Sequence, residues 1–186
     1  KPLLRILESI NIDEIKKKEK LRLPIQWVNR LDSEFRGFSG TIVSGKIKKG
    51  DVISVLPNGN KAKISEIIVS GKKVPVASDK TAVTVTLNKE IDISRGDMLV
   101  KNDEPCEISN QFQVNLVWMT ETPGLIGRSH LIKIGHQSAG VQITNIKHKL
   151  NINSFEKLPA STLQLNDICL AEISLDKSII FDEYSN

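Results

Sequence analysis

From residue 23 onward the chain is a succession of short β-branched segments separated by glycine, asparagine and aspartate, and this pattern most constrains its fold. The segment TAVTVTL, residues 81–87, alternates between an apolar face with Val83 and Val85 and a face of threonines. The segment DICLAEISL, residues 167–175, alternates in the same way. Alternation with a period of two predicts half-buried strands, and many short strands joined by turns are typical of sandwiches and barrels. We therefore predict an all-β protein of antiparallel sheet.

A change of composition divides this run of strands into two parts. The segment KNDEPCEISN, residues 101–110, has the polar, turn-rich composition of a linker. We therefore predict two consecutive small antiparallel β-barrels, over residues 23–103 and 108–186. Residues 1–22 are predicted to hold a short helix, which begins near Pro2 and repeats apolar residues at helical spacing, followed by a linker.

Local features refine this prediction. The alternation of KAKISEIIV, residues 61–69, changes phase in the middle, which indicates a β-bulge near Ser65–Glu66. A hairpin turn is predicted around Ser138–Gly140. Three aspartates each begin a strand after a turn, where a carboxylate commonly accepts a hydrogen bond from the local backbone; they are Asp51, Asp97 and Asp167.

The stretch GTIVSGK, residues 40–46, resembles a phosphate-binding loop, in which Gly, four residues, Gly and Lys are followed by Ser or Thr. The hydroxyl residue that would bind Mg²⁺ is replaced by Ile47, and β-branched residues follow where a helix is needed. We therefore interpret the glycines as residues that permit positive φ at turns or bulges of a sheet.

The charges are unevenly distributed along the chain. Residues 1–103 hold 20 Lys and Arg against 13 Asp and Glu, whereas residues 104–186 hold 6 against 9. A basic half can contact RNA, but no aromatic residues are interleaved with the lysines for stacking on bases, so nucleic acid is not the expected partner. No apolar run has transmembrane length, and the two cysteines form no CxxC motif, so we expect no membrane contact and a cytoplasmic location.

The residues with chemistry of their own form no catalytic pattern. His130, His136 and His148 show no metal-ligand spacing, and His148 lies in phase with apolar neighbours, which favours a half-buried structural role. Cys169 lies on an apolar face and is interpreted as a core residue. We predict no catalytic, cofactor-binding or metal-binding residue in this chain. The residues alone thus indicate a two-barrel binding or structural module.

Residue order is more informative than composition. Residues 23–59, LPIQWVNRLDSEFRGFSGTIVSGKIKKGDVISVLPNG, resemble the opening of the second domain of translational GTPases such as elongation factor Tu. The segments QFQVNLVWM, PGLIGRSHLIKIG, LPASTLQLNDICLAEISLD and IIFDEY are similar to the large, GTPase subunit of bacterial sulfate adenylyltransferase. This second resemblance extends over nearly the whole chain in one register.

The resemblance implies that the chain is the non-catalytic barrel region that follows a GTPase domain. In that family a separate small subunit makes adenosine 5′-phosphosulfate and pyrophosphate from ATP and sulfate, and GTP hydrolysis drives this step. The implied partners are the GTPase domain, which would bind GTP and Mg²⁺, and the catalytic small subunit. Phe35 and Arg36 are the first-choice contacts with the GTPase domain, since the matching turn of translational GTPases faces the switch regions.

Two further expectations follow from the resemblance. The family continues with additional strands where FDEYSN ends, so we expect the second barrel to lack one or two strands and its open edge to pair with a second copy as a homodimer. The alternative interpretation is the RNA- or ribosome-binding barrel pair of a translation elongation factor-like GTPase. The tract VNLVWMTETPGLIGRSHLIKIG, residues 114–135, favours the first interpretation, because elongation factors carry a different sequence there.

Overall fold

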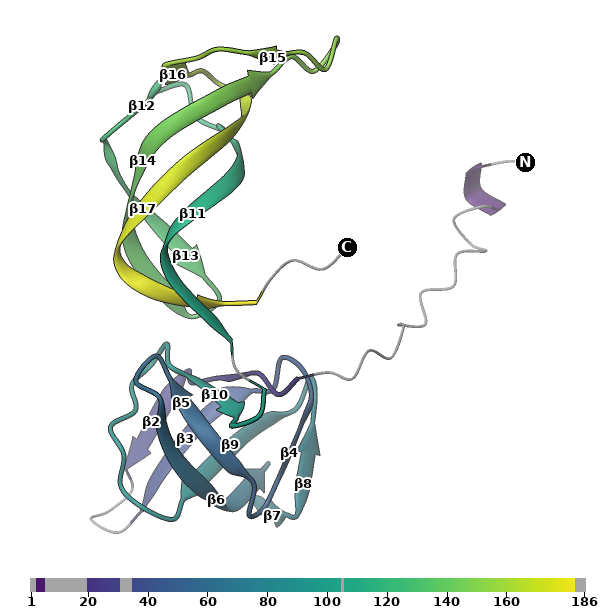
Figure 1. The fold of residues 1–186 in the computed structure, drawn as a ribbon. Helices are drawn as coiled ribbons and strands as arrows, with labels where there is room; N and C mark the ends of the chain where they lie inside the picture. The colour runs from purple at the N-terminus through teal and green to yellow at the C-terminus, as the bar shows by residue number, and fades with distance from the viewer. Residues whose placement is uncertain (1–2, 6–19, 31–34, 105, 183–186) are drawn as a thin grey trace.

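A computed structural model describes residues 3–5, 20–30, 35–104 and 106–182. Residues 3–5 are helical, and the other regular elements in these ranges are β-strands, so the all-β prediction is confirmed. The rest of the predicted N-terminal helix and its linker, up to residue 19, lies outside the described residues. Figure 1 shows the strands gathered into two barrels that follow one another along the chain, as predicted. The division into domains at residues 22, 103 and 108 stays a prediction.

The first barrel is built on one antiparallel sheet in the order β1-β10-β5-β6-β9-β3-β2, with β7 added to β6 and a separate β4–β8 pair. Its strands are β1 Leu23–Pro24, β2 Trp27–Arg30, β3 Arg36–Thr41, β4 Lys46–Lys48, β5 Val52–Leu56, β6 Asn60–Val69, β7 Lys72–Val74, β8 Val76–Ser78, β9 Ala82–Leu87 and β10 Met98–Lys101. The barrel closes because β1 pairs with β10 while β2, a few residues later, pairs with β3.

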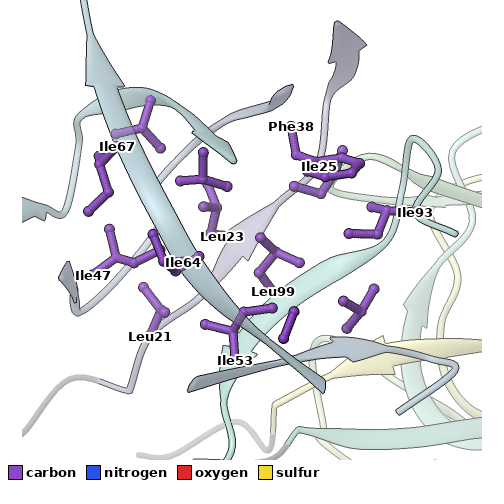
Figure 2. Close-up of a cluster of buried hydrophobic side chains, with 14 of the residues drawn as sticks. Leu21, Leu23, Ile25, Phe38, Ile47, Ile53, Ile64, Ile67, Ile93 and Leu99 are labelled. Atoms are coloured by element: carbon purple, nitrogen blue, oxygen red, sulfur yellow. The ribbon is translucent and has the colours of Figure 1, made fainter. Parts of the chain in front are cut away.

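The core of the first barrel is almost entirely aliphatic (Figure 2). Leu23, Ile53 and Leu99 are fully buried, and Phe38 is the aromatic residue among them. Burial of each such side chain contributes about 1.5–3 kcal/mol relative to exposure. The β-branched alternation therefore supplies both the strand geometry and the stability of this barrel.

The second barrel has a sheet in the order β11-β17-β14-β13, with β15 added to β14 and a separate β12–β16 pair. Its strands are β11 Glu107–Val117, β12 Gly124–Leu125, β13 Ser129–Ile134, β14 Gln137–Leu150, β15 Lys157–Leu158, β16 Thr162–Leu163 and β17 Ile168–Phe181. In β17, Cys169, Ala171 and Ile173 point into the core as the alternation predicts. Burial raises the pKa of the Cys169 thiol, as befits a core residue.

The predicted bulge is confirmed, whereas the predicted hairpin turn is misplaced. The β6–β9 ladder shifts register between Ile64 and Glu66. The turn between β13 and β14 lies at Gly135, with φ of 53°, whereas Ser138–Gly140 belong to β14. Gly140 is needed for another reason: a Cβ there would lie 2.7 Å from Oδ2 of Asp176, whose other oxygen accepts a hydrogen bond from the Gly140 N–H. The glycine at position 140 therefore marks a close approach of side chain and backbone, and the prediction of a turn there was wrong.

The three aspartates that begin strands behave as predicted. The Asp51 carboxylate accepts a hydrogen bond from the Lys48 N–H at 2.9 Å. Asp97 accepts one from the Ser94 N–H at 2.8 Å, and Asp167 accepts one from the Gln164 N–H. In each case the acceptor lies three residues after the donor and holds the turn before its strand.

Candidate interdomain contact surface

Arg36 begins β3, and the β2–β3 ladder places it opposite Arg30. Gly37 follows because the space beside it is filled: a Cβ there would lie 2.7 Å from the Thr84 methyl group and 2.9 Å from the Phe35 ring. The small residue therefore lets Phe35 pack against the barrel wall next to Arg36. Residues 31–34, between β2 and Phe35, lie outside the described residues.

The Arg36 side chain is largely covered but poorly paired. Its guanidinium carbon lies 5.4 Å from the centre of the Phe38 ring, a cation–π distance. Its ion pair with Asp92 is long, at 3.9 Å, and the Asp92 side chain is 91% exposed. The Arg36 Nε is buried and has no hydrogen-bond partner among the described residues. Arg36 is therefore held by packing, and its long ion pair with Asp92 leaves the partly exposed end of the guanidinium able to meet an anionic group.

Two hollows border Arg36 on the barrel surface. One, of about 370 Å³, is lined by Phe35, Phe38 and the β9 end. The other, of about 420 Å³, is lined by Gln26, Trp27, Val28, Arg30, Arg36 and residues 92–95. The second hollow carries three arginines against one aspartate, so it has a positive balance that suits an acidic partner surface.

Trp27 and Arg95 belong to this surface, yet the sequence did not reveal them. Trp27 follows Leu23 and Ile25 in phase and therefore reads as a core residue. The segment instead breaks between β1 and β2, so that Val28 packs on the core and Trp27 is 62% exposed. No periodicity signal marks such a break.

A second set of contacts joins the two barrels. The buried guanidinium of Arg22 donates to both carboxylate oxygens of Asp182, at 2.8 and 2.7 Å, and to the carbonyl oxygens of Leu21 and Glu104. The hydrogen bond from Arg22 lowers the pKa of Asp182. Burial raises the pKa of the neighbouring Cys106 thiol to about 11, so it stays protonated at neutral pH.

Apolar and polar contacts complete this junction. Ile180 of the second barrel is buried with Leu56 and Val100 of the first. Gln26 and His136 meet at 2.9 Å across the junction. The barrels are therefore joined by a core, an ion pair and hydrogen bonds together.

The described residues contain no group of three or more His, Cys, Asp or Glu arranged to hold a metal ion. His130 packs edge-on against Trp118, with 5.4 Å between ring centres, and His148 is half-buried as predicted. No helix in the described ranges is long and apolar enough to cross a membrane.

The GTIVSGK stretch has sheet geometry. Gly45 and Gly50 take positive φ, of 77° and 87°, and Lys46 begins strand β4. Gly40 serves a different purpose, because a Cβ there would lie 2.1 Å from the Pro24 carbonyl oxygen. The glycines therefore allow turns and close strand approach, and no helix follows them to face a phosphate.

Comparison with known proteins first defines the class. The GTP-eEF1A C-terminal domain-like family matches residues 111–186. The structure of sup35 complexed with GDP aligns with 97% of this chain and 45% of its own, with a TM-score of 0.80 at 19% identity. Translation elongation factor SelB from Methanococcus maripaludis, in complex with a GTP analogue, aligns with 96% of this chain and 41% of its own, with a TM-score of 0.68 at 17% identity. The fold is thus the barrel pair of translation-factor GTPases.

Sequence comparison is more specific. The chain is 43% identical to sulfate adenylyltransferase subunit 1 of Aliivibrio fischeri strain MJ11, over 100% of this chain and 39% of that protein. It is 37% identical to the bifunctional enzyme CysN/CysC of Xylella fastidiosa strain Temecula1, over 98% of this chain and 29% of that protein. The chain is therefore related along its whole length to sulfate adenylyltransferase subunit 1, which confirms the resemblance, and spans about two fifths of such relatives.

Proposed function

We propose that this chain is the non-catalytic β-barrel region of a sulfate adenylyltransferase large subunit that acts in the cytoplasm. In this proposal a GTPase domain of the same polypeptide hydrolyses GTP, and a catalytic small subunit makes adenosine 5′-phosphosulfate from ATP and sulfate. The barrels transmit the nucleotide state of the GTPase domain to the catalytic small subunit. The observation that carries the proposal is the 43% identity over the whole chain.

Coupling of this kind requires contacts that differ between two states of the complex. Arg36, whose ion pair with Asp92 is long at 3.9 Å, offers such a contact to an acidic group of the GTPase domain. The junction at Arg22 supports movement of both barrels as one body, because a displacement of one barrel is carried through the ion pair to the other.

The test is a reconstitution of the full-length protein with the catalytic subunit of the same organism. Formation of adenosine 5′-phosphosulfate is measured with GTP and with a non-hydrolysable GTP analogue. We expect GTP to raise the yield at least severalfold and the analogue to give no such rise. Equal yields with both nucleotides, or a full-length protein that binds RNA in place of the catalytic subunit, would contradict the proposal.

A further inference from the structure

Several exposed apolar side chains belong to strands and loops at the end of the second barrel that lies away from the first barrel. Figure 1 shows this end, which carries the β12–β16 pair and, beside the end of β14, strand β15 with the loop before it. Phe155 and Met119 are 74% and 81% exposed there. We call this set the apical surface; it comprises Met119, Leu125, Ile126, Ile152, Phe155 and Leu165. Apolar side chains that cluster on a soluble surface mark interaction sites more often than scattered ones do.

Backbone pairing brings two parts of the apical surface together. The Asn166 N–H donates to the Trp118 carbonyl at 2.7 Å, and the Trp118 N–H donates to the Asp167 carbonyl at 2.9 Å. Met119 and Leu165 therefore continue two paired segments side by side. The adjacent β12–β16 pair places Leu125 opposite Thr162.

Hydrogen bonds within the loop that carries Phe155 favour one conformation of it. The Asn151 carboxamide oxygen accepts hydrogen bonds from the N–H groups of Asn153 and Ser154, at 2.9 and 3.3 Å. The Phe155 N–H donates to the Asn151 carbonyl at 2.8 Å. A loop held by such hydrogen bonds loses less conformational entropy when a partner docks on it than a loop without them.

Phe155 adopts an unfavourable backbone conformation in this loop. Its φ is 57°, in the left-handed region that bulky residues avoid, at a cost of about 1–3 kcal/mol. A glycine would remove this strain, and the exposed ring makes no compensating burial in the chain itself. Burial of the exposed Phe155 ring by a partner would offset the free-energy cost of this backbone strain.

The charges near the apical surface cancel. Lys149 and Asp167 form an ion pair at 2.9 Å, and Glu156 and Lys157 are neighbours of opposite sign. The backbone N–H of Gln164 and the ammonium of Lys149 outweigh burial and lower the pKa of Asp167, so it stays ionised. A partner that fits this surface therefore presents an apolar, uncharged face with a polar rim.

The position of the apical surface identifies the kind of occupant. Arg22, where the described chain enters the first barrel, and Asp182, where it leaves the second, are in contact at the junction. Strand β14 begins at Gln137, which hydrogen-bonds Ile180 near that junction, and ends at Leu150 beside the apical surface. Its 14 residues span on the order of 45 Å. Both flanking segments therefore start at the opposite end of the barrel, which favours a separate polypeptide as occupant.

We propose that the apical surface is the docking face for the second polypeptide implied by the name subunit 1, the catalytic subunit, with Phe155 as one of its contacts. This inference rests on the proposed function. It assigns the two barrels separate tasks: the Arg36 surface of the first barrel faces the GTPase domain, and the apical surface of the second barrel binds the catalytic subunit.

The test is Phe155→Gly in the full-length protein, with Val43→Ser as the matched control, because Val43 is 64% exposed on the first barrel. Binding to the purified catalytic subunit is measured by calorimetry. We expect Phe155→Gly to weaken binding at least tenfold while the melting temperature stays equal or rises, since glycine relieves the positive φ. Val43→Ser should change binding less than twofold.

If the Phe155→Gly variant binds the catalytic subunit as tightly as the wild type, the inference is overturned. The proposed function can still hold in that case, because GTP-dependent synthesis by the wild-type complex tests it separately. A wild-type protein that does not bind the catalytic subunit overturns both. A dimer of the large subunit in sedimentation that Phe155→Gly abolishes, with unchanged binding of the catalytic subunit, assigns the surface to a second copy and also overturns the inference.

Discussion

Arg22 and Asp182 form an ion pair of two hydrogen bonds although 160 positions separate them in the sequence. Arg22 is 4% exposed and also donates to the Glu104 carbonyl, in the connection between the barrels. Glu104 in turn accepts a hydrogen bond from the Leu21 N–H at 2.7 Å. The segment that enters the first barrel, the connection and the end of the second barrel are therefore joined at one point.

Replacement of Asp182 by asparagine should loosen this junction. The variant keeps the shape of the side chain but leaves the buried Arg22 guanidinium without its counter-charge. Because half of the Asp182 side chain is exposed, at 51%, we expect a loss of only about 1 kcal/mol in the free energy of unfolding. Urea denaturation at pH 7 measures it, and Asp92→Asn, at a side chain that is 91% exposed, serves as the control. Equal losses in both variants would contradict the role of Asp182.

The contribution of Asp182 should disappear in acid. Its pKa is lowered in the folded protein by the hydrogen bond from Arg22, so its stabilisation is complete above the ordinary aspartate pKa of about 3.9. It is lost as the pH falls through the lowered pKa. The difference in unfolding free energy between wild type and Asp182→Asn should therefore be constant between about pH 5 and about pH 7. It should shrink below about pH 4. Asp97, whose pKa burial raises, affects both proteins equally and cancels. A difference that grows in acid would contradict this assignment.

The sequence predicted the features that depend on local residue patterns. These features were the alternation of β9 and β17, the bulge near Glu66 and the three aspartates that begin strands. Each could be predicted because it depends on only a few neighbouring residues. The outward position of Trp27 could not be predicted. It depends on where the chain passes from β1, which pairs with β10, to β2, which pairs with β3.

The candidate site was less predictable than the fold. Phe35 and Arg36 came from the resemblance alone, and no finding tests their role. Arg22 offers no local signal, because its partners other than the adjacent Leu21 carbonyl lie 82 and 160 positions away. Phe155 likewise reads as an ordinary apolar residue, and only the structure distinguishes it, by its φ of 57° and its exposure of 74%.

Gly40→Ala should destabilise the first barrel more than Gly50→Ala does. A Cβ at position 40 would lie 2.1 Å from the Pro24 carbonyl oxygen, so strands must separate to admit it. Gly50 has a φ of 87° but open space around it, so only conformational strain of about 1–2 kcal/mol opposes alanine. We expect a loss of at least about 2–3 kcal/mol for Gly40→Ala, as for other overpacked sites. Thermal and urea unfolding of both variants measure the difference; equal losses would refute the close-approach role of Gly40.

The chain on its own should not bind GTP. Ile47 lacks the hydroxyl that a phosphate-binding loop supplies to Mg²⁺, and Lys46 begins a strand. Calorimetric titration of the chain with GTP and Mg²⁺ should give no heat above dilution. The full-length protein is the positive control, and stoichiometric binding to the chain with micromolar affinity would contradict our interpretation of GTIVSGK.

Arg36→Ala in the full-length protein should weaken GTP-stimulated synthesis of adenosine 5′-phosphosulfate. The guanidinium packs on Phe38 and has a long ion pair with Asp92, so its removal should cost the barrel less than about 1 kcal/mol. A contact with an acidic group of the GTPase domain would instead be lost entirely. We expect the ratio of yields with and without GTP to fall at least threefold, whereas Lys61→Ala, which removes an exposed positive charge of the same barrel, should leave it unchanged.

Arg36→Lys tests how the contact is made. Lysine keeps the charge but lacks the planar fork that binds a carboxylate at two points. Stimulation restored only in part by lysine indicates a two-point contact, and full restoration indicates that the charge alone suffices. A stimulation ratio that stays at the wild-type value in Arg36→Ala, with the barrel folded, would exclude Arg36 from the interface with the GTPase domain.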